Sequence, residues 1–257
     1  MKDFYQISIR PSTIARLLGS VAFILAIAYI AGQFAKYALG HGHLLGLVHL
    51  FDLDAEENVP SYFSLFLLII AALLLTFIAI INRKQHLPNV SKWVVLALGF
   101  MLMSYDEAFS LHEQLVWPVR KLLGGNSSGI FYYAWVIPGI LLVFILGCYF
   151  FRFLLDLSAK TRLRFLMSAV IYIGGSIGFE LIGGKYADLH GERSFTYAML
   201  VTVEESLEMS GVIVFIWALL KYISEEFREV RIGFDFAPGR RIQDVDGGVF
   251  ATDRRRD

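Results

Sequence analysis

Cysteine is almost absent from this sequence, and charge of either sign is scarce. The single cysteine, Cys148, excludes an intramolecular disulfide and any zinc cluster built from several cysteines. Only 18% of the 257 residues are charged, and 23 Lys and Arg balance 23 Asp and Glu. The net charge of zero provides no basic field to hold a nucleic acid and no acidic excess typical of a disordered chain.

Apolar residues are abundant instead, and they occur in long runs. The hydrophobic fraction is 56% and the mean hydropathy is +0.59, a balance typical of a membrane protein. A helix needs about 20 apolar residues to cross a hydrocarbon core. Six segments meet this requirement, at about residues 14–38, 62–81, 93–116, 131–155, 163–185 and 196–222. The sequence therefore predicts an all-α protein, with a six-transmembrane-helix bundle over residues 1–222 and a flexible polar tail over residues 223–257.

The distribution of basic residues predicts the orientation of these segments. If the N-terminus is cytoplasmic, 18 of the 23 Lys and Arg residues fall on the cytoplasmic side and 5 on the outer side. Lys and Arg near membrane spans favour the cytoplasm. We therefore expect both termini to be cytoplasmic. The same topology places 13 of the 23 acids on the outer side or in the outer half of the membrane.

Ionisable residues inside the apolar segments are the main indication of function. An acid near the centre of a membrane helix costs about 2.5 to 3.5 kcal/mol, and such residues are functional by default. Seven acids and one histidine occur in three of the segments: Asp106, Glu107, His112, Glu113, Glu180, Glu204, Glu205 and Glu208. We expect all seven acids to lie in the outer half of the membrane, lining a polar cup that opens outward.

Helical periodicity predicts which of these side chains share a face. On a continuous third helix, Asp106, Ser110 and Glu113 would fall within about 60° of one another, while Tyr105 would align with His112. On the sixth helix, Glu204 and Glu208 share a stripe. Glycines around Glu180, at positions 174, 175, 178, 183 and 184, predict close approach of neighbouring helices.

Metal-dependent catalysis is the leading interpretation of this cluster. Carboxylate and imidazole ligands suit a divalent transition metal such as Fe, Mn or Zn. The expected ligands are Asp106, His112, Glu113, Glu180, His190, Glu204 and Glu208. An uncoordinated Glu107 or Glu205 would act as general base on a metal-bound water, and the substrate would be a lipid or another lipophilic molecule. Against this interpretation, the sequence contains no Glu-x-x-His pair and no HExxH motif.

Three alternatives stay open. Clustered acids at low dielectric repel one another and hold protons, which suits a proton-coupled or cation transporter. The aromatic-rich surface and the tail suit an accessory subunit of a membrane complex. The acids could also satisfy one another and fix the register of the helices, a purely structural role.

The acidic string DLDAEEN, beginning at Asp52, resembles the start of a calcium loop. It lacks the glycine and the final glutamate that an EF-hand requires, so we expect a loop that caps the second helix near Pro60 and Ser61. His41 and His43 are expected to be exposed loop residues.

Several strings together resemble a known group of proteins. They are FDLDAEENVPSYFS, MSYDEAFSLHEQL, YYAWVIPG, GFELIGGKYADLHGE and TYAMLVTVEESLEMSG, and they extend over most of the chain. In combination they resemble an uncharacterised family of bacterial multi-pass membrane proteins that is found in cyanobacteria among others. The resemblance implies a protein of the bacterial plasma (inner) membrane, and it implies no activity and no catalytic residue.

Overall fold

The computed structural model describes residues 10–40, 46–125 and 129–227, and these residues form helices with no β-strand among them. The helices are α1 (Pro11–Ala38), α2 (Leu47–Leu50), α3 (Val59–Lys84), α4 (Val90–Phe109), α5 (Leu111–Gln114), α6 (Val116–Leu122), η2 (Gly129–Phe131), α7 (Val136–Asp156), α8 (Ala159–Ile173), η3 (Gly174–Phe179), α9 (Glu180–His190) and α10 (Phe195–Glu226). Helices α8, η3 and α9 form one continuous helix from Ala159 to His190. The prediction of an all-helical protein is confirmed.

The long helices agree with the predicted apolar segments. Five of them, α1, α3, α7, the continuous α8–η3–α9 helix and α10, are long and apolar enough to cross a membrane. Helix α4 together with α5 and α6 makes a sixth when the bent pair is counted as one. The described residues therefore provide five or six helices of membrane-crossing length.

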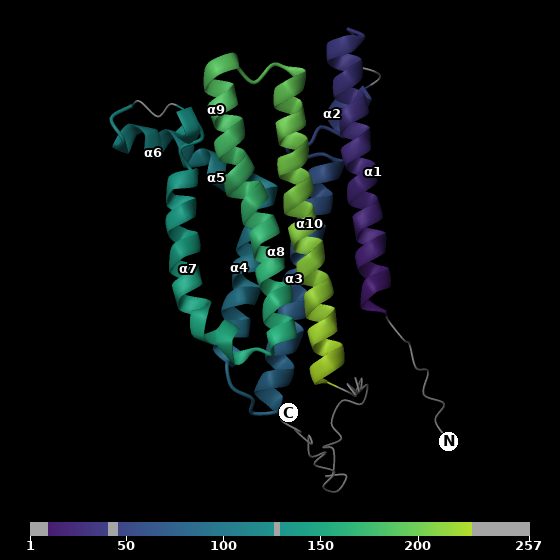
Figure 1. The fold of residues 1–257 in the computed structure, drawn as a ribbon, viewed down its shortest axis with the longest axis vertical. Helices are drawn as coiled ribbons and strands as arrows, with labels where there is room; N and C mark the ends of the chain where they lie inside the picture. Colours follow the sequence, from purple (N-terminus) through teal and green to yellow (C-terminus); the bar gives the residue numbers. More distant parts are fainter. Residues whose placement is uncertain (1–9, 41–45, 126–128, 228–257) are drawn as a thin grey trace, which may run out of the picture.

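The third predicted segment, residues 93–116, is not the continuous helix that was expected. Helix α4 ends at Phe109, and Ser110 adopts a left-handed conformation with φ of 45°. The chain then bends by 73° into α5 and α6. In Figure 1 these short helices lie at one side of the upper end of the bundle, above α7. The predicted faces of this segment are therefore wrong beyond Ser110, because the helical periodicity is interrupted there.

The long helices run side by side, so the bundle has two ends (Figure 1). We call the end where α1 begins and α10 ends the lower end, and the opposite end, where α9 joins α10, the upper end. The C-terminal segment predicted as a tail begins as helix, since α10 continues to Glu226. Residues 228–257 of that tail, like His41 and His43, lie outside the described residues.

Helix α10 is the centre of the packed core. It contacts α1, α3 and α8, and its Ile216, Ala218 and Leu219 are fully buried. The facing side of α3 contributes residues such as Leu67 and Leu75, which are also fully buried. The complete burial of these aliphatic side chains places them in close van der Waals contact across the helix interfaces, which stabilises the packing of α10 with its neighbours.

Helix α7 is packed very differently, because it is held at its two ends. Its buried residues are only Val136 near the upper end and Phe150 and Phe153 near the lower end. At the lower end Lys92 of α4 donates a hydrogen bond to the backbone carbonyl of Tyr149 at 3.1 Å. Between these attachments α7 stands at the edge of the bundle (Figure 1).

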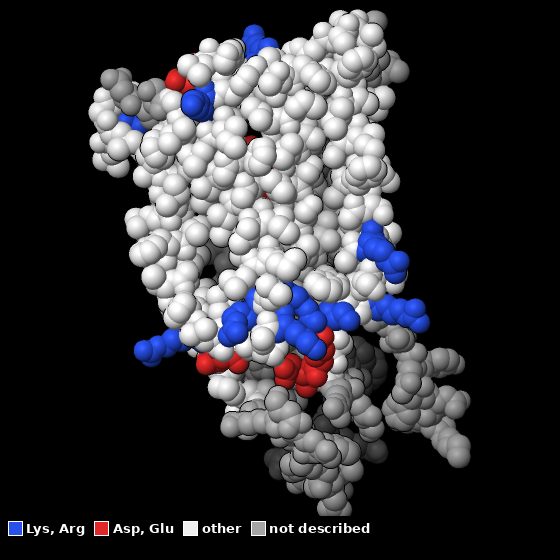
Figure 2. Space-filling model, viewed as in Figure 1, with Lys and Arg blue, Asp and Glu red and all other residues white. Residues whose placement is uncertain are grey.

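Charged side chains on the surface gather near the lower end. Figure 2 shows Lys and Arg in a band there, below a broad surface without charge. Within this band Arg164 of α8 binds the Glu225 carboxylate of α10 through two hydrogen bonds of 2.9 and 3.0 Å. This bidentate pair joins the lower ends of the two helices.

Candidate functional site

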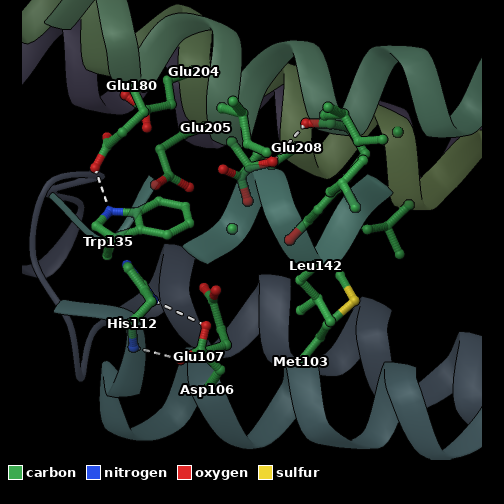
Figure 3. A pocket seen from close by; sticks show the side chains of 18 of the residues that line it. Met103, Asp106, Glu107, His112, Trp135, Leu142, Glu180, Glu204, Glu205 and Glu208 are labelled. Atoms are coloured by element: carbon green, nitrogen blue, oxygen red, sulfur yellow. Dashed lines mark hydrogen bonds and ion pairs between the residues drawn. The ribbon is translucent and has the colours of Figure 1, made fainter. Parts of the chain in front are cut away.

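A cavity of about 1000 Å³ lies between α4, α7, the α8–η3–α9 helix and α10. Its upper part is lined by carboxyl side chains from α4, α5, the α8–η3–α9 helix, α10 and two loops. They are Asp54, Glu56, Asp106, Glu107, Glu113, Glu180, Glu192, Glu204, Glu205 and Glu208. All seven acids singled out in the apolar segments therefore reach one cavity, as the sequence predicts. Figure 3 shows Glu107 facing Glu205 and Glu208 across it.

The lower part of the cavity is apolar. Its walls include Phe100 and Met103 of α4, Leu142 and Leu146 of α7, and Phe215 of α10. Below these residues an aromatic cluster forms the floor, and it is centred on Trp93, whose ring contacts Phe153 and Tyr222 at centroid distances of 5.0 and 4.9 Å. The cavity thus has one acidic end and one hydrocarbon-like end.

Two glycines allow the α8–η3–α9 helix to approach α10 at the level of the acids. A Cβ atom at Gly175 would lie 2.8 Å from the backbone oxygen of Glu204, and one at Gly211 would lie 2.7 Å from Tyr172. The predicted close approach near Glu180 is therefore correct at Gly175. Among the other predicted glycines, Gly184 lies against Tyr132 and Tyr133, whereas positions 174, 178 and 183 have open space around them.

The helix next to Glu180 has an unusual hydrogen-bond pattern. Residues Gly174–Phe179 form a π-helix, η3, between two α-helical stretches. Single turns of this kind occur frequently at functional sites. Here the turn immediately precedes Glu180, and it sets the direction in which that carboxylate leaves the helix.

Asp106 and His112 form a pair that depends on the break at Ser110. After the break, the backbone N–H of His112 donates to Asp106 Oδ1 at 2.8 Å, and His112 Nδ1 lies 2.9 Å from Oδ2. A carboxylate on Nδ1 fixes the orientation of an imidazole ring. His112 Nε2 has no hydrogen-bond partner in the part of the chain that the structure describes.

Trp135 connects the top of α7 to the carboxylate cluster. Its indole N–H donates to Glu180 Oε1 at 2.7 Å, and its ring lies 4.8 Å from the His112 ring in an edge-to-face arrangement (Figure 3). Gly139, one turn further along α7, leaves room for the indole ring. No motif or helical spacing in the sequence indicates this contact, so it was not predicted.

A tyrosine pair lies beside the cluster at the upper end. The hydroxyls of Tyr133 and Tyr197 are 2.6 Å apart, and Tyr133 also donates to Glu192 at 2.9 Å. Burial raises the pKa of Tyr133 far above its ordinary value, and the hydrogen bond to Tyr197 raises it further. Tyr133 therefore serves here as a neutral hydrogen-bond donor.

The acidic loop before α3 closes part of the upper end. Asn58 caps α3 through a reciprocal hydrogen-bond pair with Ser61, which confirms the predicted capping role of this segment. Asp54 and Glu56 of the loop line the cavity. Burial raises the pKa of Asp54 to about 7, and the nearby Asp52 contributes to the shift.

The two residues predicted as general bases differ from the other acids in their hydrogen bonding. Glu107 and Glu205 line the cavity, and neither makes a hydrogen bond to another side chain that the structure describes. Glu180 and Asp106, in contrast, are held by Trp135 and His112. The arrangement thus separates carboxylates that are fixed by protein donors from carboxylates that are free to contact a ligand.

The predicted metal ligands reach the cavity with one exception. His190 is exposed, stacks on the Tyr186 ring at 4.7 Å, and does not line the cavity. Across residues 10–40, 46–125 and 129–227, no three His, Cys, Asp or Glu side chains are grouped closely enough to hold a metal ion. The oxygen and imidazole donors suit Fe, Mn or Zn by their chemistry, but they are spread around the cavity wall.

One basic residue in the cavity wall was not predicted as part of the site. Arg120 of α6 lines the cavity, donates a hydrogen bond to the backbone oxygen of Tyr132, and lies over the Tyr132 ring. Its Nε atom is buried without a hydrogen-bond partner among the described residues. The bend at Ser110 brings Arg120 to the wall of the cavity that the acids also line, and no sequence signal indicates this bend.

Comparison with known proteins identifies the family of the chain. The family described as domain of unknown function DUF8692 matches residues 20–223, so the chain belongs to it. This agrees with the resemblance to an uncharacterised family. No curated protein and no solved structure matches the chain.

Proposed function

We propose that this member of the DUF8692 family is a membrane-embedded enzyme that acts on a lipid or another lipophilic substrate. The observation that supports this most directly is the cavity, which joins a carboxylate-rich end to an apolar end. Ligand sites are mostly apolar, with a few convergent polar groups that orient the ligand. An amphiphile would place its chain in the lower part and its polar head among the carboxylates.

The proposal includes a bacterial inner membrane, with both termini in the cytoplasm. Its support is the band of basic residues near the lower end, where α1 begins and α10 ends (Figure 2). Basic residues favour the cytoplasmic side of a membrane. In this orientation the carboxylates lie toward the outer side.

The charge of the cavity restricts the head group of the proposed substrate. Ten acids line the cavity, whereas its basic side chains are His112 and Arg120. An anionic head would be repelled by each of these acids that is ionised. We therefore expect a head that is cationic or rich in hydrogen-bond donors.

The proposed chemistry is acid–base catalysis at the polar end. Asp106 orients His112, and Glu107 or Glu205, in its ionised form, would take a proton from a substrate hydroxyl or from water. Glu180, held by Trp135, would position the head group. Positioned acid–base groups typically contribute a factor of about 10² to 10⁴ to the rate.

A divalent transition metal belongs to the proposal as a separate, testable part. Asp106, Glu113, Glu180, Glu204 and Glu208, with His112, offer ligand types that suit Fe, Mn or Zn. Elemental analysis of unchelated protein and of the Glu204→Gln variant tests this part. Stoichiometric metal that is lost in the variant supports it, and protein without stoichiometric metal removes it.

Turnover of lipids tests the enzyme proposal itself. Purified protein would be incubated with a bacterial membrane lipid extract, and the products would be followed by mass spectrometry. We expect a changed lipid species with the wild type and a loss of about 10²-fold or more in rate with Glu205→Gln. Glu57→Gln removes a carboxylate from the acidic loop outside the cavity wall, and it should keep full activity.

A proton-coupled transporter is the second candidate, favoured by the length of the cavity. The lining extends from Glu180 down to Phe165, 15 residues earlier on the same continuous helix, which corresponds to about 22 Å. Transport would require the aromatic floor around Trp93 to open. Proteoliposome flux that is unchanged by Glu204→Gln or Glu180→Gln would contradict it. An accessory subunit would instead show no turnover and no flux without its complex.

A further inference from the structure

Helix α7 forms a wall of the cavity and is sparsely packed against its neighbouring helices. The middle of α7 contributes no buried residue, yet one of its faces lines the cavity. Leu142 and Leu146 on that face are 56% and 39% exposed. In a packed helix pair, such residues would be buried against the neighbouring helix. The middle of α7 therefore borders the cavity on one face without packing against a neighbouring helix there.

The neighbouring helix α8 has an apolar depression on its outer surface. The depression has a volume of about 310 Å³ and is lined by Leu163, Leu166, Met167, Val170 and Ile171. No charged or polar side chain contributes to it. This surface suits a hydrocarbon chain.

Leu166 joins the depression to the cavity, because it lines both. Ser168 and Tyr172 of α8 face α10, where the Ser168 hydroxyl donates to the Gly211 carbonyl at 2.9 Å. Helical periodicity places Leu166 on the opposite edge of the cavity-facing stripe of α8, away from α10. In Figure 1 α7 stands on the side of α8 opposite α10, and both helices line the cavity. We call the space between these two consecutive antiparallel helices the gap.

We infer that the substrate reaches the cavity sideways, with its hydrocarbon chain passing between α7 and α8 from the surrounding lipid. The inference rests on the proposed function. The occupant is the chain of a membrane amphiphile, because the route is apolar from the depression through Leu166 to the lower cavity. The part of the cavity that would hold this hydrocarbon chain is about 20 Å long, from Gly139 to Phe153 along α7. This length is most of the thickness of a hydrocarbon core of about 30 Å. The polar head then meets the carboxylates at the upper end.

The lateral route can be tested with a photoreactive probe in lipid nanodiscs. The probe is a long-chain primary amine with a diazirine in its chain, and labelled peptides are identified by mass spectrometry. Val212 and Phe215 of α10 line the cavity but are only 4% and 6% exposed, so label on them reports a chain inside the cavity. We expect such label in the wild type.

Two variants narrow the route from opposite sides. Leu166→Trp and Leu146→Trp each add a large ring at an exposed position of the gap, so both should fold, which thermal unfolding verifies. We expect the initial rate of α10 labelling to fall about tenfold in each, while the final extent of labelling stays unchanged. Leu141→Trp is the control, since Leu141 of α7 is 59% exposed and lines neither the depression nor the cavity.

The outcomes separate the inference from the proposed function. Equal labelling rates in the wild type and in both gap variants, with α10 still labelled, would overturn lateral access and leave the proposed function in place. Failure to label α10 in the wild type would overturn both. Slower labelling in Leu141→Trp as well would show an effect of surface bulk rather than of the gap, and it would also overturn the inference.

Discussion

Helices α3 and α7 are both long, apolar and able to cross a membrane, but they have opposite relations to their neighbours. In α3 an entire face is buried against α4 and α10, and Leu67, Ala71 and Leu75 have no exposed surface. In α7 the middle of the helix has no buried residue, and its inner face borders a cavity. Helix α3 is therefore packed against other helices, whereas α7 forms one wall of a cavity.

This difference shows what an apolar segment does not reveal. The hydrophobic effect favours removal of apolar surface from water, whether the new neighbour is protein, lipid or an apolar ligand. Tight packing adds a further contribution that only close neighbours provide. Substitutions can separate these two contributions. They test whether the core around α3 and α10 differs from the cavity wall formed by α7 as the structure indicates.

Removal of side-chain volume should have the largest effect on the free energy of unfolding, and only in the core around α3 and α10. Leu75→Ala on α3 deletes atoms from a fully buried position and leaves a void, so we expect a loss of about 2 to 5 kcal/mol in the free energy of unfolding. Leu142→Ala is the matched change on α7, where the side chain is 56% exposed. We expect little loss there, measured by unfolding in detergent. Comparable losses in both variants would mean that the middle of α7 is packed after all.

Addition of a single methyl group at the close approach of η3 to α10 should have the next largest effect. A Cβ at Gly175 would lie 2.8 Å from a backbone oxygen of α10, which cannot move independently, so we expect Gly175→Ala to cost about 1 to 3 kcal/mol. Gly178→Ala is the control in the same π-helix, with open space around its Cβ. Unfolding in denaturant compares them. A tolerated Gly175→Ala would contradict the contact between η3 and α10.

Loss of the contact at the top of α7 should have a smaller effect. Trp135→Phe keeps an aromatic ring but removes the hydrogen bond to Glu180, so we expect a loss of about 1 to 2 kcal/mol. Trp117→Phe, at a position that is 70% exposed, should change the stability much less. Equal effects in thermal unfolding would mean that the upper end of α7 does not depend on Glu180.

The smallest effect concerns the pH dependence of stability at Asp54. Its folded pKa of about 7 exceeds the unfolded value of 3.8, so the folded protein favours the protonated carboxyl. The destabilisation from ionising Asp54 is absent below about pH 4, grows as the pH rises to 7, and is complete above it. The side chain is open to the cavity, and water there limits the size of the effect.

Asp54→Asn removes this dependence. The midpoint of thermal unfolding of the variant, relative to the wild type, should therefore increase between pH 4 and pH 7 and then stay constant. Glu57→Gln removes one charge from the same loop and controls for net charge. A midpoint difference that is the same at every pH would contradict a raised pKa at Asp54.

The sequence was sufficient to predict the helices and the convergence of the acids. Apolar length locates the helices, and the cost of an acid in an apolar segment makes Glu180 and Glu204 conspicuous. The break at Ser110 could not be predicted, because serine in a left-handed conformation leaves no mark in composition or periodicity. Every contact that depends on the break, including the pair of Asp106 with His112 and the placement of Arg120, was therefore missed.

The π-helix before Glu180 makes this part of the chain sensitive to insertions and deletions rather than to substitutions. A π-turn holds one residue more than the α-helix it interrupts, and relatives that lack it would be one residue shorter between Gly174 and Phe179. Deletion of one residue there would give a more regular helix, but it would turn everything beyond it by about 100°. Glu180 would leave Trp135 and Glu204, which lie beside it in Figure 3. The length of this six-residue turn, more than the identity of its residues, is therefore the quantity to compare across the family.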